Sequence, residues 1–239
     1  MDSPDGDGNT SSGNGKIKVL GISSSTRVCS RSEKMLKEVL KSAEDFGGET
    51  ELIRLADMNI KPCRGCCSEE ADGCVYPCVD TDDDTNLTLE KMIEADSFAF
   101  ASPVRWGSLS ELQRLIEKMT PLEDNRDKLF KQFGREPLLG KPFTLVASED
   151  YEGVSLAFSQ VMWALNRMGL LPLPYVIHRM ALLDRRIVQI GLRFFLGYRK
   201  LDWIDNEIRL AGRNLVLFPQ LIKNAKFIFD DYKVIEPTT

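Results

Sequence analysis

The sequence predicts an α/β protein built on a doubly wound, five-stranded parallel sheet. Short apolar segments alternate along the chain with longer segments in which apolar residues recur at helical spacing. Crossover connections of this kind are right-handed, and they cover both faces of a parallel sheet with helices. At 239 residues, with 43% hydrophobic and 28% charged residues, the chain is long enough for one such domain and an addition to it.

Each element of this fold is marked by its own pattern. The strands are predicted at residues 17–22, 49–55, 97–101, 142–147 and 171–177. The helices are predicted at residues 32–46, 87–95, 109–119, 154–168 and 205–229. The first helix is the best marked, because Met35, Leu36, Val39 and Leu40 lie at helical spacing and Gly47 follows where a C-cap is expected. The remaining segments are a polar connection at 121–137 and an apolar, arginine-containing segment at 186–196, which we expect to form an interface or a lid.

These boundaries divide the chain into three parts. Residues 1–16 are rich in Asp, Gly, Ser and Asn without an apolar run, so we expect a disordered tail rather than a signal peptide. Residues 17–178 form the predicted α/β domain, with a cysteine-rich loop at 61–84, and residues 179–239 form a helical extension packed on it. No run of eighteen apolar residues predicts a transmembrane span, and we expect the protein in the reducing cytoplasm.

The charge of the chain argues against one class of partner. The formal net charge is −5 and the pI is near 5.2. A nucleic-acid-binding protein is expected to carry a concentrated basic face, which this composition does not predict. We therefore expect no nucleic-acid partner.

Five of the six cysteines lie within sixteen residues, at positions 63, 66, 67, 74 and 78. Metal sites gather thiolates from short loops, whereas disulfide frameworks spread their cysteines along the chain. The pairs Cys63-x2-Cys66 and Cys74-x3-Cys78 supply four sulfurs, which suit either tetrahedral zinc or a four-iron four-sulfur cluster. The spacing does not choose between them, and Cys67 is an alternate ligand or a bystander. Reduced thiols without any ligand are the remaining alternative.

Ligands of doubly wound sheets bind beyond the carboxyl ends of the strands, where three polar loops are predicted. The loop from Ser23 to Ser32 is rich in hydroxyls, contains Arg27 and opens a helix, so it suits a phosphate monoester. It lacks the glycines of dinucleotide and nucleoside triphosphate motifs. The alternative is that these hydroxyls only cap the helix and form turns.

The other two loops each contain an aromatic residue. In the loop at 102–108, Trp106 stands between Pro103 and Gly107, where it suits a flat ring ligand or anchors the core beneath the loop. The loop at 148–153 is polar and contains Tyr151. The force of the prediction comes from three candidate ligand loops at one edge of the sheet.

Together these residues resemble the flavodoxin-like NADPH-dependent FMN reductases, and within them the iron-sulfur flavoproteins. The resemblance runs from about residue 16 to residue 177. It is carried by the Lys-Val-Leu-Gly-Ile-Ser-x-Ser-x-Arg segment ending at Arg27, the Pro-Cys-x-Gly-Cys loop, Cys78 four residues before Asp82, the Glu-Ala-Asp96 segment before Ala-Ser-Pro-Val, and Gly-Lys-Pro-Phe143. In two places the chain departs from the family, since Arg105 stands where Tyr is common and Glu69 where the third cysteine is expected.

The resemblance implies strand order 2-1-3-4-5, a cysteine-rich loop after the second strand, and extra C-terminal helices. It also implies bound FMN. The FMN phosphate would lie on Ser23, Ser25, Thr26, Arg27, Ser30 and Ser32. The isoalloxazine would lie near Pro103, Val104, Arg105, Trp106, Gly107, Ser148, Glu149, Asp150 and Tyr151. The favoured cluster ligands are Cys63, Cys66, Cys74 and Cys78, with Cys67 as the alternate, and a homodimer or homotetramer is expected.

The leading functional hypothesis is an FMN-dependent oxidoreductase with an iron-sulfur cluster, which moves electrons between the cluster, FMN and a small-molecule substrate or an electron-transfer protein. Because FMN carries the chemistry, no catalytic side chain is expected. One alternative is an NAD(P)H-dependent FMN or quinone reductase with zinc or no metal in the loop. Another is a non-catalytic, flavodoxin-like electron carrier.

Two further features are interpreted as structural and not as metal-binding or catalytic. The acidic run at Asp80, Asp82, Asp83 and Asp84 is typical of a helix N-terminus more often than of a divalent-metal loop. His178 is the only histidine and has no evident nucleophile beside it. Without a G-x-S-x-G motif, a Ser-His-Asp hydrolase is not predicted.

Overall fold

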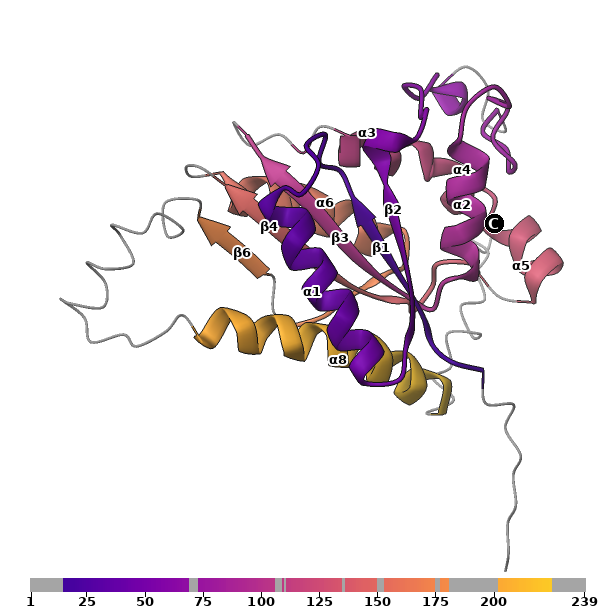
Figure 1. The fold of residues 1–239 in the computed structure, drawn as a ribbon. Coiled ribbons are helices and arrows are strands. Elements are labelled where there is room, and N and C mark those ends of the chain that lie inside the picture. The colour runs from indigo at the N-terminus through magenta and orange to yellow at the C-terminus, as the bar shows by residue number, and fades with distance from the viewer. Residues whose placement is uncertain are drawn as a thin grey trace, which may run out of the picture.

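The computed structural model describes residues 15–68, 73–105, 109, 111–134, 136–149, 153–174, 177–180 and 202–224. The strands β1 (Lys18–Ser23), β2 (Glu49–Arg54), β3 (Ser97–Val104) and β4 (Pro142–Glu149) form a parallel sheet. With β5 (Leu171–Pro172) at the end, the order is β2-β1-β3-β4-β5, which confirms the predicted order (Figure 1).

The fifth strand is divided, although the sequence predicted one strand at 171–177. Leu171 and Pro172 pair with the start of β4, and β6 (Ile177–Met180) pairs with the end of the same strand. The N–H groups of Leu171 and Leu173 donate to the carbonyl oxygens of Lys141 and Phe143 in β4, so Pro172 and Pro174, which alternate with them, place their missing N–H groups on the free side of this edge strand. Pro103 is tolerated inside β3, because β1 stops opposite Ala101 and the ladder beyond that point involves only β4.

Helices cover both faces of the sheet. On one face lie α1 (Arg31–Asp45) and α8 (Asp202–Asn224). On the other lie α2 (Thr85–Glu94), α3 (Glu111–Lys118) and α6 (Val154–Arg167), as Figure 1 shows. The alternation along β3 fits this arrangement, because Phe98 and Phe100 pack toward the second set while Ala99 and Ala101 pack toward α1 and α8.

Two short helices occupy the segment that the sequence predicted as a polar connection. They are α4 (Thr120–Asp124) and α5 (Arg126–Phe133). Pro121 stands in the first turn of α4, where its missing N–H costs nothing, and Leu122 and Leu129 are buried in the core. The helical signal was weak because each helix buries so few apolar residues.

Beyond β6 the structure describes residues 202–224, where α8 confirms the predicted 205–229 helix up to residue 224 and begins three residues earlier. The tail up to residue 14 and the apolar segment at 186–196 lie outside the described residues. Within the described part, none of the helices has the length and apolar character needed to cross a membrane.

The contact between α1 and α8 depends on Gly212. A Cβ added there would lie 2.5 Å from the carbonyl oxygen of Val39 and 2.5 Å from the Cβ of Ser42. Alanine normally stabilises a helix interior by about 1 kcal/mol over glycine, but overpacking costs about 1 to 3 kcal/mol. Because one of these close contacts is with a backbone oxygen, which cannot turn away, we expect Gly212→Ala to show the upper half of the difference, a free energy of unfolding lowered by about 1 to 2 kcal/mol in urea titrations. Gly15→Ala, which meets nothing within 4 Å, is the control.

Candidate cofactor sites

The loop between β1 and α1 has the features of an anion site. Ser30 is the N-cap of α1, and its Oγ accepts a hydrogen bond from the Glu33 N–H at 3.2 Å. The Ser25 hydroxyl accepts one from the Arg27 N–H at 3.3 Å, while the Arg27 side chain is exposed. Cys29 turns the chain with φ 56°, in the left-handed region. The loop therefore holds hydroxyls, a helix N-terminus and an exposed guanidinium close together in sequence.

Ser23 has a buried hydroxyl that is left unpaired. Its side chain is 0% exposed, and its Oγ has no hydrogen-bond partner among the described residues. A buried hydroxyl without a partner is costly, so this atom is suited to a bound polar group beyond the end of β1. The neighbouring Ser24 is already paired, with its Oγ 2.8 Å from the Ser102 Oγ and 3.3 Å from the Ala101 carbonyl oxygen. Sequence reasoning missed Ser24, which ties the first loop to the second.

The structure brings the three predicted loops to one edge of the sheet. Ser23 is in register with Ala101, and Pro103 is in register with Ser148. In Figure 1 the tips of β3 and β4 reach the edge at which α1 begins. Arg105 is exposed just beyond β3. Trp106, Gly107, Asp150 and Tyr151 lie outside the described residues, so their predicted contacts with a flat ring stay predictions.

A buried carboxylate supports the first turn of α1. The Glu33 side chain is 1% exposed and pairs with Arg54 Nε at 2.9 Å and with Lys37 Nζ at 2.7 Å. Arg54, at the end of β2, also pairs with Asp57 at 2.8 Å. Burial raises the pKa of Glu33, but the hydrogen bonds from Lys37 and Arg54 outweigh it, so the pKa lies below its ordinary value. The pairs keep this negative charge from opposing an anion at the same helix terminus.

Three aspartates at the end of the cysteine loop bind the residues at its beginning. The Asp84 carboxylate accepts a hydrogen bond from the Asn59 N–H at 2.7 Å, and the Asp83 carboxylate accepts from the N–H groups of Lys61 at 3.1 Å and Thr85 at 2.9 Å. The Asp82 carboxylate pairs with the Lys61 ammonium. The acidic run thus fastens the two ends of the loop together at the start of α2.

Five thiols from this loop line one small pocket. Its lining consists of Cys63, Arg64, Cys66, Cys67, Cys74, Cys78, Asp80, Lys118, Thr120 and Pro121. Two asparagines that sequence reasoning missed hold the loop from outside. The Asn86 side chain binds both the N–H and the carbonyl oxygen of Cys78, at 2.7 and 2.9 Å. The Asn125 amide donates to the carbonyl oxygen of Cys74 at 2.9 Å and to that of Pro121 at 3.0 Å.

The thiols are gathered in the pocket without being arranged as ligands of one ion. No three His, Cys, Asp or Glu side chains of the described residues are placed to hold a metal ion together. The pocket that these thiols share with five other residues has a volume of about 20 Å³. Burial, followed by the charge of Asp124 and of the neighbouring cysteines, raises the pKa of Cys74 to about 12. Without a cation, this crowded thiol therefore stays protonated at neutral pH.

Lys118 is the buried cation of this pocket. Its side chain is 1% exposed, and its ammonium pairs with Asp80 and lies 3.4 Å from Asp83 Oδ2. Burial lowers the pKa of Lys118, but the hydrogen bond to Asp80 and the charges of Cys78 and Asp83 together raise it above its ordinary value. Lys118 therefore carries a positive charge at the wall of the thiol pocket.

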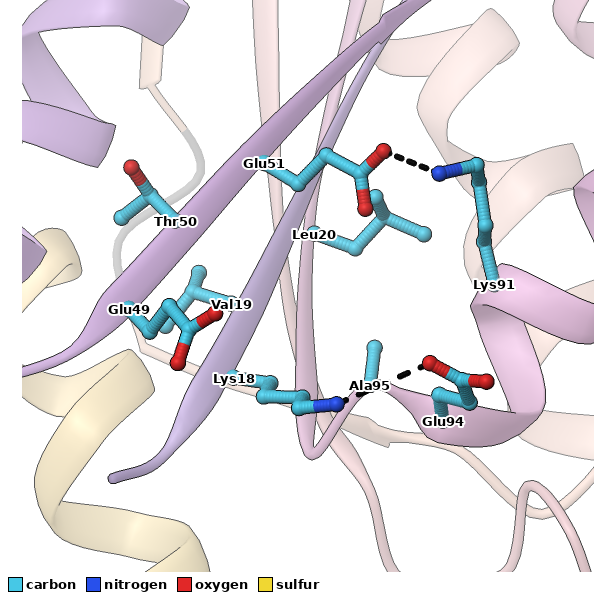
Figure 2. A pocket seen from close by; sticks show the side chains of 9 residues that line it. All are labelled: Lys18, Val19, Leu20, Glu49, Thr50, Glu51, Lys91, Glu94 and Ala95. Atoms are coloured by element: carbon cyan, nitrogen blue, oxygen red, sulfur yellow. Dashed lines mark hydrogen bonds and ion pairs between the residues drawn. The ribbon is translucent and has the colours of Figure 1, made fainter. Parts of the chain in front are cut away.

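A second hollow, at the opposite edge of the sheet, is not a candidate cofactor site. It lies at the start of β1 and β2 and the end of α2, and its volume is about 70 Å³ (Figure 2). Figure 2 shows two ion pairs among its charged side chains, Glu51 with Lys91 and Lys18 with Glu94, the latter at 3.6 Å. The loop after β1, with the unpaired Ser23 hydroxyl, and the pocket lined by five thiols are therefore the candidate cofactor sites.

A doubly wound 2-1-3-4-5 sheet, here with a hydroxyl-rich loop at its first βα turn, defines the class of flavodoxin-like proteins. Comparison with known families agrees with this class. The family described as NADPH-dependent FMN reductase matches residues 17–179. The chain belongs to the NADPH-dependent FMN reductase family, which confirms the resemblance stated from the sequence.

Several relatives are named as iron-sulfur flavoproteins. The iron-sulfur flavoprotein MJ1083 of Methanocaldococcus jannaschii is 39% identical over 109 residues, which are 44% of this chain and 53% of the relative. An iron-sulfur flavoprotein of Methanosarcina thermophila is 30% identical over 120 residues, 49% of this chain and 60% of the relative. The matched part is thus little more than half of each relative.

Solved structures show the same fold at low sequence identity. RosB with bound 8-demethyl-8-formylriboflavin-5'-phosphate has a TM-score of 0.66 and 18% identity, over 88% of this chain and 82% of RosB. The NAD(P)H:quinone oxidoreductase of Methanothermobacter marburgensis has a TM-score of 0.51 and 16% identity, over 84% of this chain and 100% of that protein.

Proposed function

We propose that the protein is an FMN-dependent oxidoreductase that carries an iron-sulfur cluster in the cysteine pocket. In this proposal it moves electrons between the cluster, FMN and a small-molecule substrate or redox partner. The observation that carries the proposal is the convergence of five thiols on one pocket in a chain of the FMN reductase family. The names of the iron-sulfur flavoprotein relatives support the cluster.

The loop after β1 supports the FMN assignment by its chemistry. The unpaired Ser23 hydroxyl is available to donate to a phosphate oxygen, and Arg27 offers an exposed guanidinium for the same group. Ser24 and Ser102 hold the first two loops in register, so that the flavin ring would lie over the ends of β3 and β4. FMN, when bound, supplies the electron transfer, and the chain supplies binding and orientation.

The donor set of the cysteine pocket fits an iron-sulfur cluster. Thiolates are its usual ligands, and a bound cationic core would stabilise the Cys74 thiolate that burial and neighbouring charges now disfavour. Cys63, Cys66, Cys74 and Cys78 are the proposed ligands, with Cys67 as the alternate. Asn86 and Asn125 would fix the backbone of Cys78 and Cys74 while the thiols turn toward the core. Zinc suits the same donors and is distinguished by experiment.

The deciding experiment is the absorption spectrum of anaerobically purified protein, with iron, acid-labile sulfide, zinc and flavin quantified on the same sample. One flavin with about four irons and four sulfides per chain is the expected result. Flavin with zinc or without metal would favour an NAD(P)H-dependent FMN or quinone reductase, and rapid flavin reduction by NAD(P)H would support that class. Absence of flavin and iron would overturn the proposal.

Arg27 offers a direct check of the phosphate loop. An exposed, charge-assisted hydrogen bond contributes about 1.5 kcal/mol, so Arg27→Ala is expected to raise the Kd for FMN about tenfold. The measurement is a fluorescence titration of deflavinated protein, in which flavin emission is quenched on binding. Lys41→Ala, which removes an exposed charge farther along α1, should leave the Kd unchanged. An unaltered Kd in Arg27→Ala would show that the phosphate lies elsewhere.

A further inference from the structure

Lys118 lies between two aspartates, Asp80 and Asp83, and the pocket lined by the five thiols. It is the last residue of α3, and it lines the thiol pocket together with Asp80. Its ammonium pairs with Asp80 on one side and with Asp83, whose side chain is 0% exposed, at 3.4 Å. A lysine this deeply buried is rare unless its charge is compensated. Lys118 therefore places a positive charge in the wall of the pocket that the five thiols line.

The two aspartates beside Lys118 differ in the other partners that their carboxylates have. The Asp83 carboxylate accepts hydrogen bonds from the Thr85 and Lys61 N–H groups, so its oxygens are engaged without the ammonium. Asp80 is 12% exposed, faces the pocket, and also lies 3.6 Å from the Arg64 guanidinium. The Lys118 ammonium therefore interacts with Asp80 and with any negative charge that is held in the cysteine pocket.

We infer that Lys118 is the buried counter-charge of the cysteine pocket and raises the reduction potential of its cluster, while Asp80 opposes this effect. The inference rests on the proposed function, because it concerns a cluster bound by these thiols. When the cluster accepts one electron from the flavin, the pocket gains one negative charge and the flavin is oxidised by one electron. A cation enclosed in a poorly screened pocket favours that gain, and a carboxylate beside it disfavours it.

The test is an anaerobic redox titration of the protein with both cofactors bound, followed by cluster absorbance and electron paramagnetic resonance. Lys118→Met is expected to shift the cluster midpoint potential to more negative values. Asp80→Asn is expected to shift it in the opposite direction. Opposite signs distinguish a charge effect from loosened packing, which would not reverse between the two variants.

Asp82→Asn is the matched control. It removes the same charge two residues beyond Asp80, but the Asp82 side chain is 71% exposed and pairs with Lys61, so solvent screens it from the pocket. Its midpoint potential should equal that of the unaltered protein. Asp80→Asn leaves the pairing of Lys118 with Asp83 in place, so it tests the inference even where Lys118→Met fails to fold.

The result that overturns the inference is an Asp80→Asn protein whose cluster potential is unchanged or lowered. A Lys118→Met protein that folds and keeps the original potential would overturn it as well. Iron and sulfide are quantified before each titration. An iron-free unaltered protein would refute the proposed cluster and this inference together, whereas a bound cluster with unmoved potentials would refute the inference alone.

Discussion

Cys63→Ala is expected to purify with FMN but with almost no iron or acid-labile sulfide. The reason is that a four-iron cluster needs four thiolates, and loss of one ligand leaves an iron site open. FMN should be retained, because its proposed phosphate loop at 23–32 belongs to a different connection of the sheet. The measurement is the ratio of iron and sulfide to flavin per chain. Full iron and sulfide in this variant would contradict the assignment of Cys63 as a ligand.

Cys29 supplies the control for this experiment. It is exposed and lies outside the cysteine pocket, so Cys29→Ala should keep its full iron and sulfide content per chain, even if its position in the proposed phosphate loop lowers the flavin content. The same assay decides between the two candidates for the remaining ligand. Cys74→Ala is expected to lose the cluster and Cys67→Ala to keep it. The opposite outcome would make Cys67 the ligand, and would leave Cys74 as the buried thiol with a raised pKa.

The fold was predictable because its signals are local. The helical spacing of Met35, Leu36, Val39 and Leu40 marks α1, and these residues are buried against the sheet. The divided last strand was not foreseen, because the apolar segment at 171–177 carries no local signal of where its pairing with β4 is interrupted. The short α4 and α5 were missed for the complementary reason, because a helix of one or two turns buries too few residues to show a period.

The candidate sites were predictable as far as sequence neighbours define them. Crowded cysteines predicted a common pocket, and polar residues after strands predicted a common edge. The residues that support those sites come from far along the chain. Asn125 binds the backbone of Cys74 across 51 residues, and Lys118 meets Asp80 across 38. Such pairs leave no local pattern, and Lys118 at the end of an amphipathic helix has the sequence context of an ordinary exposed C-terminal lysine.

Glu33→Ala is expected to lower the free energy of unfolding by about 3 kcal/mol at neutral pH. Removing one partner of a buried ion pair costs about 3 to 5 kcal/mol, because the remaining charge is left uncompensated. The lower end applies, since Arg54 is 18% exposed and keeps Asp57 as a partner. Urea unfolding followed by circular dichroism measures the difference. Glu38→Ala, an exposed substitution on the same helix, should change stability by less than about 0.5 kcal/mol.

The contribution of Glu33 should also depend on pH with a defined sign. The folded protein holds the pKa of Glu33 below its ordinary value, so the unfolded chain binds the proton more readily than the folded one. The stabilisation is therefore complete above about pH 5, and it is lost as the pH falls from there through the lowered pKa. The stability difference between the unaltered protein and Glu33→Ala should shrink over that range. A difference that stayed constant down to about pH 3 would mean that the carboxylate acts through packing and not through its charge.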